Sequence, residues 1–290
     1  MNQQTTGRAG FVMAIVLAAA SLLPAVAVAQ TLDAATAAAL DKALTGAHRS
    51  DRNKARDPYR HPKETLGFFG LRQDMTVVEI WPGGGWYTEV LAPVLKDRGK
   101  LYAAQYGPRA IAPYQRAEDA ALLEKAKKYP DVFGKLQYTA LWSPDDLVIA
   151  PPGSVDLVVT FRNVHNWVNA QYKLDAGKLF GAFYAALKPG GVLGVVDHRW
   201  PDAKTEDPNA KNGYVSEERV RALARAAGFE FAGRSDVNRN PKDTHDHPNG
   251  VWTLLPDLEL PPGADRQKYA AIGESDRLTL KFRKPAAKAK

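Results

Sequence analysis

The sequence contains no cysteine among its 290 residues. This absence excludes disulfide bonds, a thiolate nucleophile and the cysteine-based zinc sites. It suits an exported protein that does not depend on disulfides. Long apolar runs are also scarce, since the run from Phe11 to Leu23 is shorter than the roughly 20 residues that a membrane-spanning helix needs.

That apolar run belongs to a predicted signal peptide. Arg8 precedes it, and Ala27-Val28-Ala29 supplies small residues at the cleavage positions. We expect cleavage before Gln30, so that residues 1–29 are removed and the mature chain is periplasmic or secreted, without stable membrane insertion. An uncleaved membrane anchor is the alternative.

The chain also has little net charge outside its ends. The total is +7, but without Arg8 and the five basic residues of positions 281–290 about +1 remains. A nucleic-acid-binding domain should present a basic face. We therefore expect no nucleic-acid partner and assign the excess charge to a frayed end, with residues 285–290 as a basic tail.

The mature chain is long enough for one large α/β domain. Residues 30–74 are predicted to form an N-terminal helical segment, and residues 75–284 alternate strands with helices. The strands are expected at 76–80, 100–105, 135–140, 155–161, 192–196, 229–233 and 278–282, and the helices at 87–96, 113–128, 175–187 and 216–227. This alternation predicts a doubly wound, mainly parallel seven-stranded sheet. Residues 236–276 lack periodicity, and we expect them to form a lid over a pocket.

A glycine triplet, Gly83, Gly84 and Gly85, follows the first predicted strand and precedes a helix. In doubly wound sheets, ligands bind beyond the carboxyl ends of the strands. Glycine lets the backbone approach a ligand closely, and the N-terminus of the helix directs free N–H groups toward it. The alternative is a tight strand-to-helix turn without a ligand.

The wider pattern resembles the class I S-adenosylmethionine-dependent methyltransferases. It consists of an acid, the glycine turn and a helix, and later a Lys-Pro-Gly-Gly turn before a strand, and it runs from about Met75 to Phe282. It is most similar to a group of exported, predicted methyltransferases with Pro-Gly-Gly-Gly-Trp-Tyr after the first strand and an Arg-Leu-Thr-Leu-Lys-Phe-Arg-Lys-type last strand. The resemblance implies a Rossmann-like methyltransferase fold, S-adenosylmethionine as cofactor and a small-molecule substrate as methyl acceptor.

The resemblance also implies roles for individual residues. Glu79 matches the acid that helps to hold the amino-acid end of the cofactor, and the glycine triplet forms the turn beside it. Trp81 stands where the family has its first glycine. Gln105 replaces the acid that binds the ribose hydroxyls, and Asp145 maps to the site after the third strand that meets adenine.

Polar residues follow the fourth and fifth predicted strands at the same edge of the sheet. Asn163 and His165 come after the fourth strand, and Asp197 and His198 end the fifth. We assign Asn163 to cofactor binding and His165, Asp197 and His198 to catalysis, because histidine suits proton transfer near neutral pH. In the alternative interpretation, these side chains satisfy backbone groups in loops.

Two other functions stay open. A metal-dependent hydrolase would use His165 and His198 together with His245 and His247, which are spaced to lie on one side of an extended segment. This spacing matches no strong metal motif, so we assign no metal. The other alternative is a non-catalytic envelope protein that binds a ligand on the same fold.

Aromatic residues are expected near the same edge. They could form a cage for adenine or for a flat or cationic acceptor, or they could pack the N-terminal segment onto the domain. These residues are Tyr59, Trp81, Trp86, Tyr87, Trp142 and Trp167.

Overall fold

The computed structural model describes residue 1 and residues 32–287. The predicted signal peptide and its cleavage site therefore lie outside the described part of the chain, apart from Met1. Among the described residues, no helix is both long enough and apolar enough to cross a bilayer.

The centre of the molecule is a mainly parallel sheet with the strand order β3-β2-β1-β4-β5-β8-β7. Strands β1 to β5 pair with one another in parallel, and β8 is antiparallel to both β5 and β7. The seven predicted strands are confirmed, and the two-residue β6 pairs with the end of β5. The strands are β1 (Thr76–Ile80), β2 (Lys100–Gln105), β3 (Gln137–Ala140), β4 (Val155–Phe161), β5 (Leu187–Trp200), β6 (Val215–Ser216), β7 (Glu230–Arg234) and β8 (Arg277–Arg283).

The four predicted helices of the domain are present as α5, α6, α9 and α10. Helix α10 begins where its sequence predicts, because the Ser216 side chain caps it by accepting a hydrogen bond from the Arg219 N–H at 3.1 Å. The helices are α1 (Ala34–Thr45), α2 (Asp51–Lys54), α3 (Asp57–Arg60), α4 (Pro62–Phe69), α5 (Thr88–Leu95), α6 (Pro113–Lys128), α7 (Pro130–Phe133), α8 (Val164–Trp167), α9 (Ala176–Ala186), α10 (Glu217–Ala226) and α11 (Arg266–Ile272).

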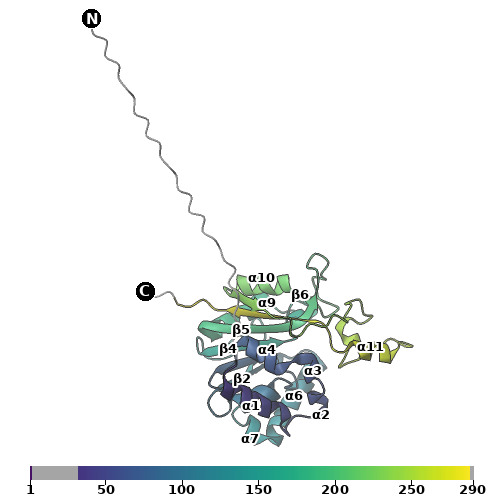
Figure 1. Ribbon diagram of the computed structural model, residues 1–290, viewed down its shortest axis with the longest axis horizontal. Helices are drawn as coiled ribbons and strands as arrows, with labels where there is room; N and C mark the ends of the chain where they lie inside the picture. The colour runs from purple at the N-terminus through teal and green to yellow at the C-terminus, as the bar shows by residue number, and fades with distance from the viewer. Residues whose placement is uncertain (2–31, 288–290) are drawn as a thin grey trace.

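Each face of the sheet carries its own apolar core. Val78 faces the core made with α9 and α10, whereas its neighbour Val77 faces the core made with α1, α4 and α5. This alternation follows from the two-residue period of a strand. Figure 1 shows α9 and α10 on one side of β5 and α4 on the other. The predicted N-terminal helical segment thus packs onto one face of the sheet.

Two expectations about the end of the domain are wrong in detail. The Lys-Pro-Gly-Gly stretch was expected as a turn, but it lies within β5, where the Gly190 N–H donates to the Lys284 carbonyl at 2.9 Å. The basic residues expected at a frayed end are partly fixed. Lys281 and Arg283 belong to β8, and the Lys284 ammonium donates to two carbonyls, at 2.7 and 2.8 Å.

Candidate functional site

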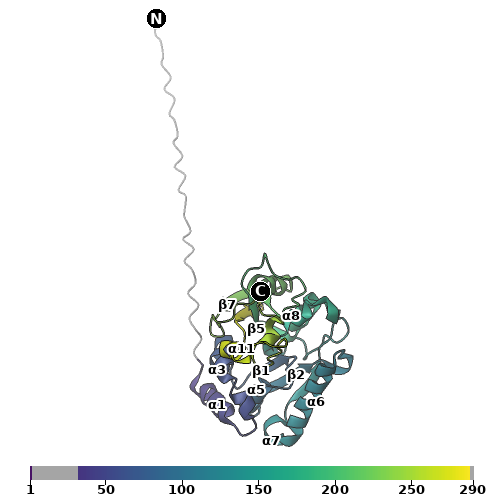
Figure 2. The same cartoon turned by 90° about the vertical axis from the view of Figure 1, so that its right-hand side faces the viewer.

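The carboxyl ends of β1, β2, β4 and β5 meet at one edge of the sheet. Figure 2 looks onto this edge, where α3, α8 and α11 surround the ends of β1 and β5. Because these elements are far apart in the sequence, the fold brings the predicted site residues together from several loops.

The glycine turn has the backbone that its sequence predicts. Gly83 and Gly85 have φ angles of 59° and 81°, in the left-handed region that favours glycine. A Cβ atom on Gly85 would lie 2.6 Å from the Leu122 side chain of α6, so any other residue there would have to displace Leu122. Gly84 has no such neighbour within 4 Å, and its position is open.

Glu79 lies buried at the end of β1, beside this turn. Its carboxyl accepts a hydrogen bond from the Thr88 hydroxyl at 2.7 Å. Burial raises the pKa of Glu79 to about 8, against the smaller lowering effects of Thr88 and Lys125. The carboxyl is therefore largely protonated at neutral pH, and a cationic group bound next to it would favour ionisation.

Trp81, which the resemblance aligns with the family's first glycine, has a backbone in the left-handed region that favours glycine, with φ at 45°. Its indole N–H donates to the Leu141 carbonyl at 3.0 Å. The ring packs against Tyr106, Trp142 and Trp167, with centroid distances of 4.7, 5.5 and 5.8 Å. The indole thus fills space between the segments that follow β2, β3 and β4.

The other three residues predicted to bind the cofactor, Gln105, Asn163 and Asp145, each lie in a different environment. The Gln105 amide donates to the Gly83 carbonyl at 2.9 Å, and its buried Oε1 has no hydrogen-bond partner within the described structure. Asn163 donates to the Ile80 carbonyl at 2.9 Å and so fixes the end of β1. Asp145 lies apart from them, half-exposed and paired with Arg109 at 3.0 Å. Its contact with adenine stays a prediction.

The three predicted catalytic residues lie together. Asp197 is fully buried, and its Oδ1 accepts hydrogen bonds from His165 Nδ1 and the His198 N–H, both at 2.8 Å. Its Oδ2 accepts from the His165 backbone N–H at 3.0 Å. Because Nδ1 of His165 donates to a carboxylate, Nε2 of the neutral ring carries the free lone pair. This arrangement orients His165 as a proton acceptor.

His198 is the second imidazole of the group, with its ring centroid 5.2 Å from that of His165. Its Nδ1 hydrogen-bonds the Ser275 hydroxyl. Burial holds the pKa of His198 well below its usual range, and His165 and the guanidinium groups of Arg277 and Arg162 lower it further. His198 is therefore neutral at physiological pH.

The same three residues are spaced so that they could hold a metal ion, with ligand atoms within 4.8 Å of one another. In the described structure the Asp197 carboxylate accepts three hydrogen bonds, from the His165 ring, the His165 backbone and the His198 backbone. His247 binds Asp243 at 2.9 Å instead of joining this group. The four histidines of the hydrolase hypothesis therefore do not form one set.

The long segment of residues 236–276 reaches the site, as the lid hypothesis requires. The Trp252 ring lies 6.4 Å from that of His165 in an edge-to-face arrangement. The segment is not structureless, since it contains α11 and a short 3-10 helix at Gly250–Thr253. Its closure over a ligand stays a prediction.

Sequence reasoning missed a group of charged residues beside His198. Arg56, Arg60 and Arg277 all contact the carboxylate of Glu274, and Arg162 lies near them. The position of Arg162, next to Asn163 after β4, was a usable signal. The contacts of Arg56 and Arg60 with Glu274 join residues more than 200 positions apart, which no local pattern reveals.

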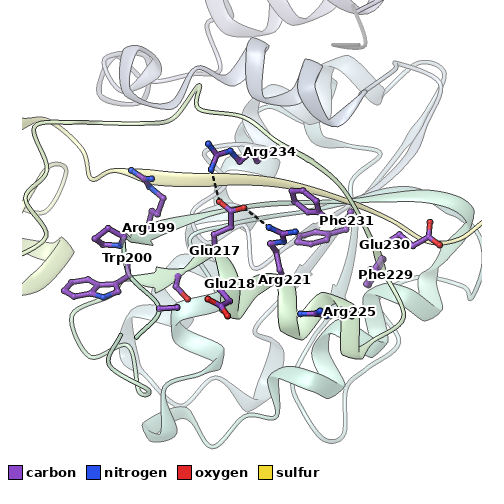
Figure 3. Close-up of a pocket in the computed structure, with 14 residues that line it drawn as sticks. Arg199, Trp200, Glu217, Glu218, Arg221, Arg225, Phe229, Glu230, Phe231 and Arg234 are labelled. Atoms are coloured by element: carbon purple, nitrogen blue, oxygen red, sulfur yellow. Dashed lines mark ion pairs between the residues drawn. The ribbon is translucent and has the colours of Figure 1, made fainter. Parts of the chain in front are cut away.

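A separate groove of about 830 Å³ lies between α10 and β7. Figure 3 shows Glu217 within it, paired with Arg221 at 3.5 Å and Arg234 at 3.7 Å. None of the predicted site residues lines this groove.

Comparison with known proteins supports the fold. No family model matches the sequence, and no curated protein matches it. A S-adenosylmethionine-dependent methyltransferase from Aquifex aeolicus is similar in structure, with 18% identity, a TM-score of 0.51 and coverage of 81% of this chain and 100% of the other. The [4+2]-cyclase SpnF matches at 14% identity and a TM-score of 0.55, covering 89% and 99%. Geranyl diphosphate C-methyltransferase from Streptomyces coelicolor matches at 13% identity and a TM-score of 0.52, covering 84% and 87%. At these identities the similarity establishes the fold, and the cyclase is an example of this fold serving another reaction.

Proposed function

We propose that this chain, which has the fold of the class I S-adenosylmethionine-dependent methyltransferases, is an exported enzyme that methylates a small molecule. The observation that carries the proposal is the pair of His165 and Asp197, held at the same sheet edge as the glycine turn and Glu79. Methyl transfer needs an acceptor aligned with the cofactor and, for some acceptors, a base. This edge of the sheet brings a candidate base close to the predicted cofactor residues.

The residues predicted to hold the amino-acid end of the cofactor have suitable chemistry. Glu79 is a buried carboxyl that a cationic ammonium would ionise, and Gly84 offers open backbone beside it. Gln105 adds a buried, unpaired carbonyl oxygen that can accept a hydrogen bond from a hydroxyl. When bound, the cofactor supplies an electrophilic methyl group.

The adenine side differs from the family pattern, because the Trp81 indole fills space between the loops there. We therefore expect weaker cofactor binding than a glycine at position 81 would allow. The same observation favours the second candidate function, a non-catalytic binding protein on this fold.

In the proposed reaction, this chain's own residues handle the proton. Asp197 holds the His165 ring and fixes its tautomer, and His165 Nε2 accepts a proton from the acceptor. Neutral His198 adds no positive charge that would hinder this step. Trp252 packs beside His165 and helps to exclude water.

The first test is thermal unfolding of the chain from Gln30 onward with S-adenosylhomocysteine. A ligand at about one hundred times its dissociation constant stabilises by ~2.7 kcal/mol, which corresponds to a rise of roughly 5–10 °C for a domain of this size. No rise at millimolar ligand would reject the methyltransferase and favour the binding protein. Export is tested separately by sequencing the N-terminus of the protein recovered outside the cytoplasm, with Gln30 expected.

A further inference from the structure

Four guanidinium groups and one buried carboxylate lie beside the proposed catalytic residues. Arg56 Nε and Arg60 Nε bind the two oxygens of Glu274 at 2.6 and 3.0 Å, and Arg277 also pairs with Glu274. Arg162 makes no salt bridge with any described residue. We call Arg56, Arg60, Arg162 and Arg277 the arginine cluster.

The arginine cluster has more positive charge than its neighbours balance. Three of its guanidinium groups pair with one carboxylate, that of Glu274, and Arg162 adds a fourth charge nearby, which leaves an excess of about three. Glu118 also lies near Arg162, and burial raises the pKa of that carboxyl, so it balances at most one more charge. Against the effect of burial, Arg60, Arg277 and Arg56 hold the pKa of Glu274 well below its usual range, so this carboxylate is fully ionised and has no more charge to give.

Donors in the cluster are also left without acceptors. Arg56 Nη2, Arg60 Nη2 and Arg277 Nε are buried and have no hydrogen-bond partner within the described structure. Arg60 and Arg277 are themselves more than nine-tenths buried. Leaving buried charged donors unpaired costs several kcal/mol, so three of them in one place indicate that an acceptor is missing.

The cluster lies next to the catalytic histidines. Arg277 on β8 is the cross-strand partner of His198 on β5, so their side chains lie on the same face of the sheet. Arg162 follows β4, one residue before Asn163, and its N–H donates to the Val196 carbonyl at 2.7 Å. Arg56 and Arg162 are partly exposed, so the cluster can be reached from solvent.

The cluster also argues against a cationic acceptor. The Trp86 ring, one of the aromatic residues expected to bind a cationic acceptor, already contacts cations of this chain. The guanidinium groups of Arg60 and Arg49 lie 4.6 and 5.1 Å from the ring centroid. A positively charged acceptor would add to the unbalanced positive charge of the cluster.

We propose that the arginine cluster binds an anionic group, a carboxylate or a phosphate, of the molecule that is methylated beside His165. That the bound molecule is the methyl acceptor rests on the proposed function, whereas the anion site itself rests on the cluster alone. Guanidinium groups bind both anions through paired, charge-assisted hydrogen bonds. The unpaired N–H groups of Arg56, Arg60 and Arg277, together with Arg162, supply the donors.

The test uses inorganic phosphate and malonate as probes, each compared with sodium chloride at equal ionic strength. Thermal unfolding and calorimetric titration are measured for the wild type, Arg162→Gln and the control Arg72→Gln. Arg72 is exposed and pairs with Asp74, so this control makes the same change in net charge away from the site.

We expect at least one probe to stabilise the wild type and Arg72→Gln beyond the chloride effect, and Arg162→Gln to bind it roughly tenfold or more weakly. Without an anion, Arg162→Gln should be as stable as the wild type or more so, because an unbalanced charge is removed. Equal affinity in Arg162→Gln and the wild type, or no effect beyond chloride, would overturn the anion site.

A parallel titration with S-adenosylhomocysteine separates the two possible sources of the anion. If the cluster serves the acceptor, the probe and S-adenosylhomocysteine bind together. If they compete, the cluster holds the cofactor's own carboxylate, and the assignment to the acceptor is wrong. If the probe binds and S-adenosylhomocysteine does not, the anion site stands and the proposed methyl transfer fails.

Discussion

Replacing Glu79 by glutamine should remove a large pH dependence from the stability of the fold. Glutamine keeps the shape and can still accept the hydrogen bond from Thr88. In the wild type, burial raises the pKa of this carboxyl from 4.5 to about 8. The folded state therefore keeps a proton that the unfolded chain releases, and stability falls as the pH rises from about 4.5 to about 8.

The size of the effect follows from the two pKa values. Between about pH 5 and pH 8, the wild type should lose roughly 3–4 kcal/mol of unfolding free energy that Glu79→Gln does not lose. For a chain of this length, that is a difference of roughly 7–14 °C in melting temperature. Thermal unfolding of both proteins at the two pH values measures it, and titrations of all other groups cancel in the comparison.

Glu89 provides the matched control. It is also buried, but it pairs with Lys125 at 2.6 Å and accepts hydrogen bonds from Asn53 at 2.9 and 3.0 Å. Glu89→Gln should therefore lower the free energy of unfolding, whereas Glu79→Gln removes the cost of ionising a buried carboxyl at high pH. If the wild type and Glu79→Gln keep the same difference in melting temperature at both pH values, Glu79 is ionised in the free protein and the reasoning about its burial is refuted.

Three further predictions concern the other parts of the site and the fold. Trp81→Gly should lower the free energy of unfolding by about 2–4 kcal/mol, since the loss of a buried aromatic side chain outweighs about 1 kcal/mol of relieved backbone strain. The same change should tighten the binding of S-adenosylhomocysteine, measured by calorimetry. Weaker binding would mean that the indole supports adenine instead of displacing it. Asp197→Asn should slow methyl transfer by roughly 10²–10⁴-fold by disturbing the base His165 and should change the pH profile of the rate, whereas a normal profile would make the role of Asp197 purely structural. Ser216→Ala should cost about 1 kcal/mol in chemical denaturation through loss of the α10 cap, and an unchanged midpoint would contradict the capping role.

The sequence predicted the sheet well because its strands are short, apolar and separated by clear helical periods. Lys100–Gln105, Pro113–Lys128 and Val155–Phe161 have the predicted bounds. The end of β5 was predicted less well. Gly190 and Gly191 favour a turn locally, but pairing with the chain after β8 extends the strand through them. Tertiary hydrogen bonds thus overrode the local signal.

The candidate site was predicted where neighbouring strand ends carry polar residues, as at His165 and Asp197. The prediction could not reach contacts made across the whole chain. Glu274 meets Arg60 because α3 and the segment before β8 pack at the same edge, and no pattern in either segment specifies the other. Trp81 was noticed as an anomaly, but only its packing shows that the indole turns inward.

The contacts of Glu274 also have a consequence for the order in which the protein matures. Arg56 and Arg60 precede the whole sheet in the chain, and their carboxylate partner comes just before its last strand. During synthesis, which proceeds from the N-terminus, these arginines remain without that partner until every strand of the sheet except β8 has been made. Contacts of such large sequence separation also slow folding. The anion site is therefore among the last features to form, and its completion reports that both ends of the domain have come together.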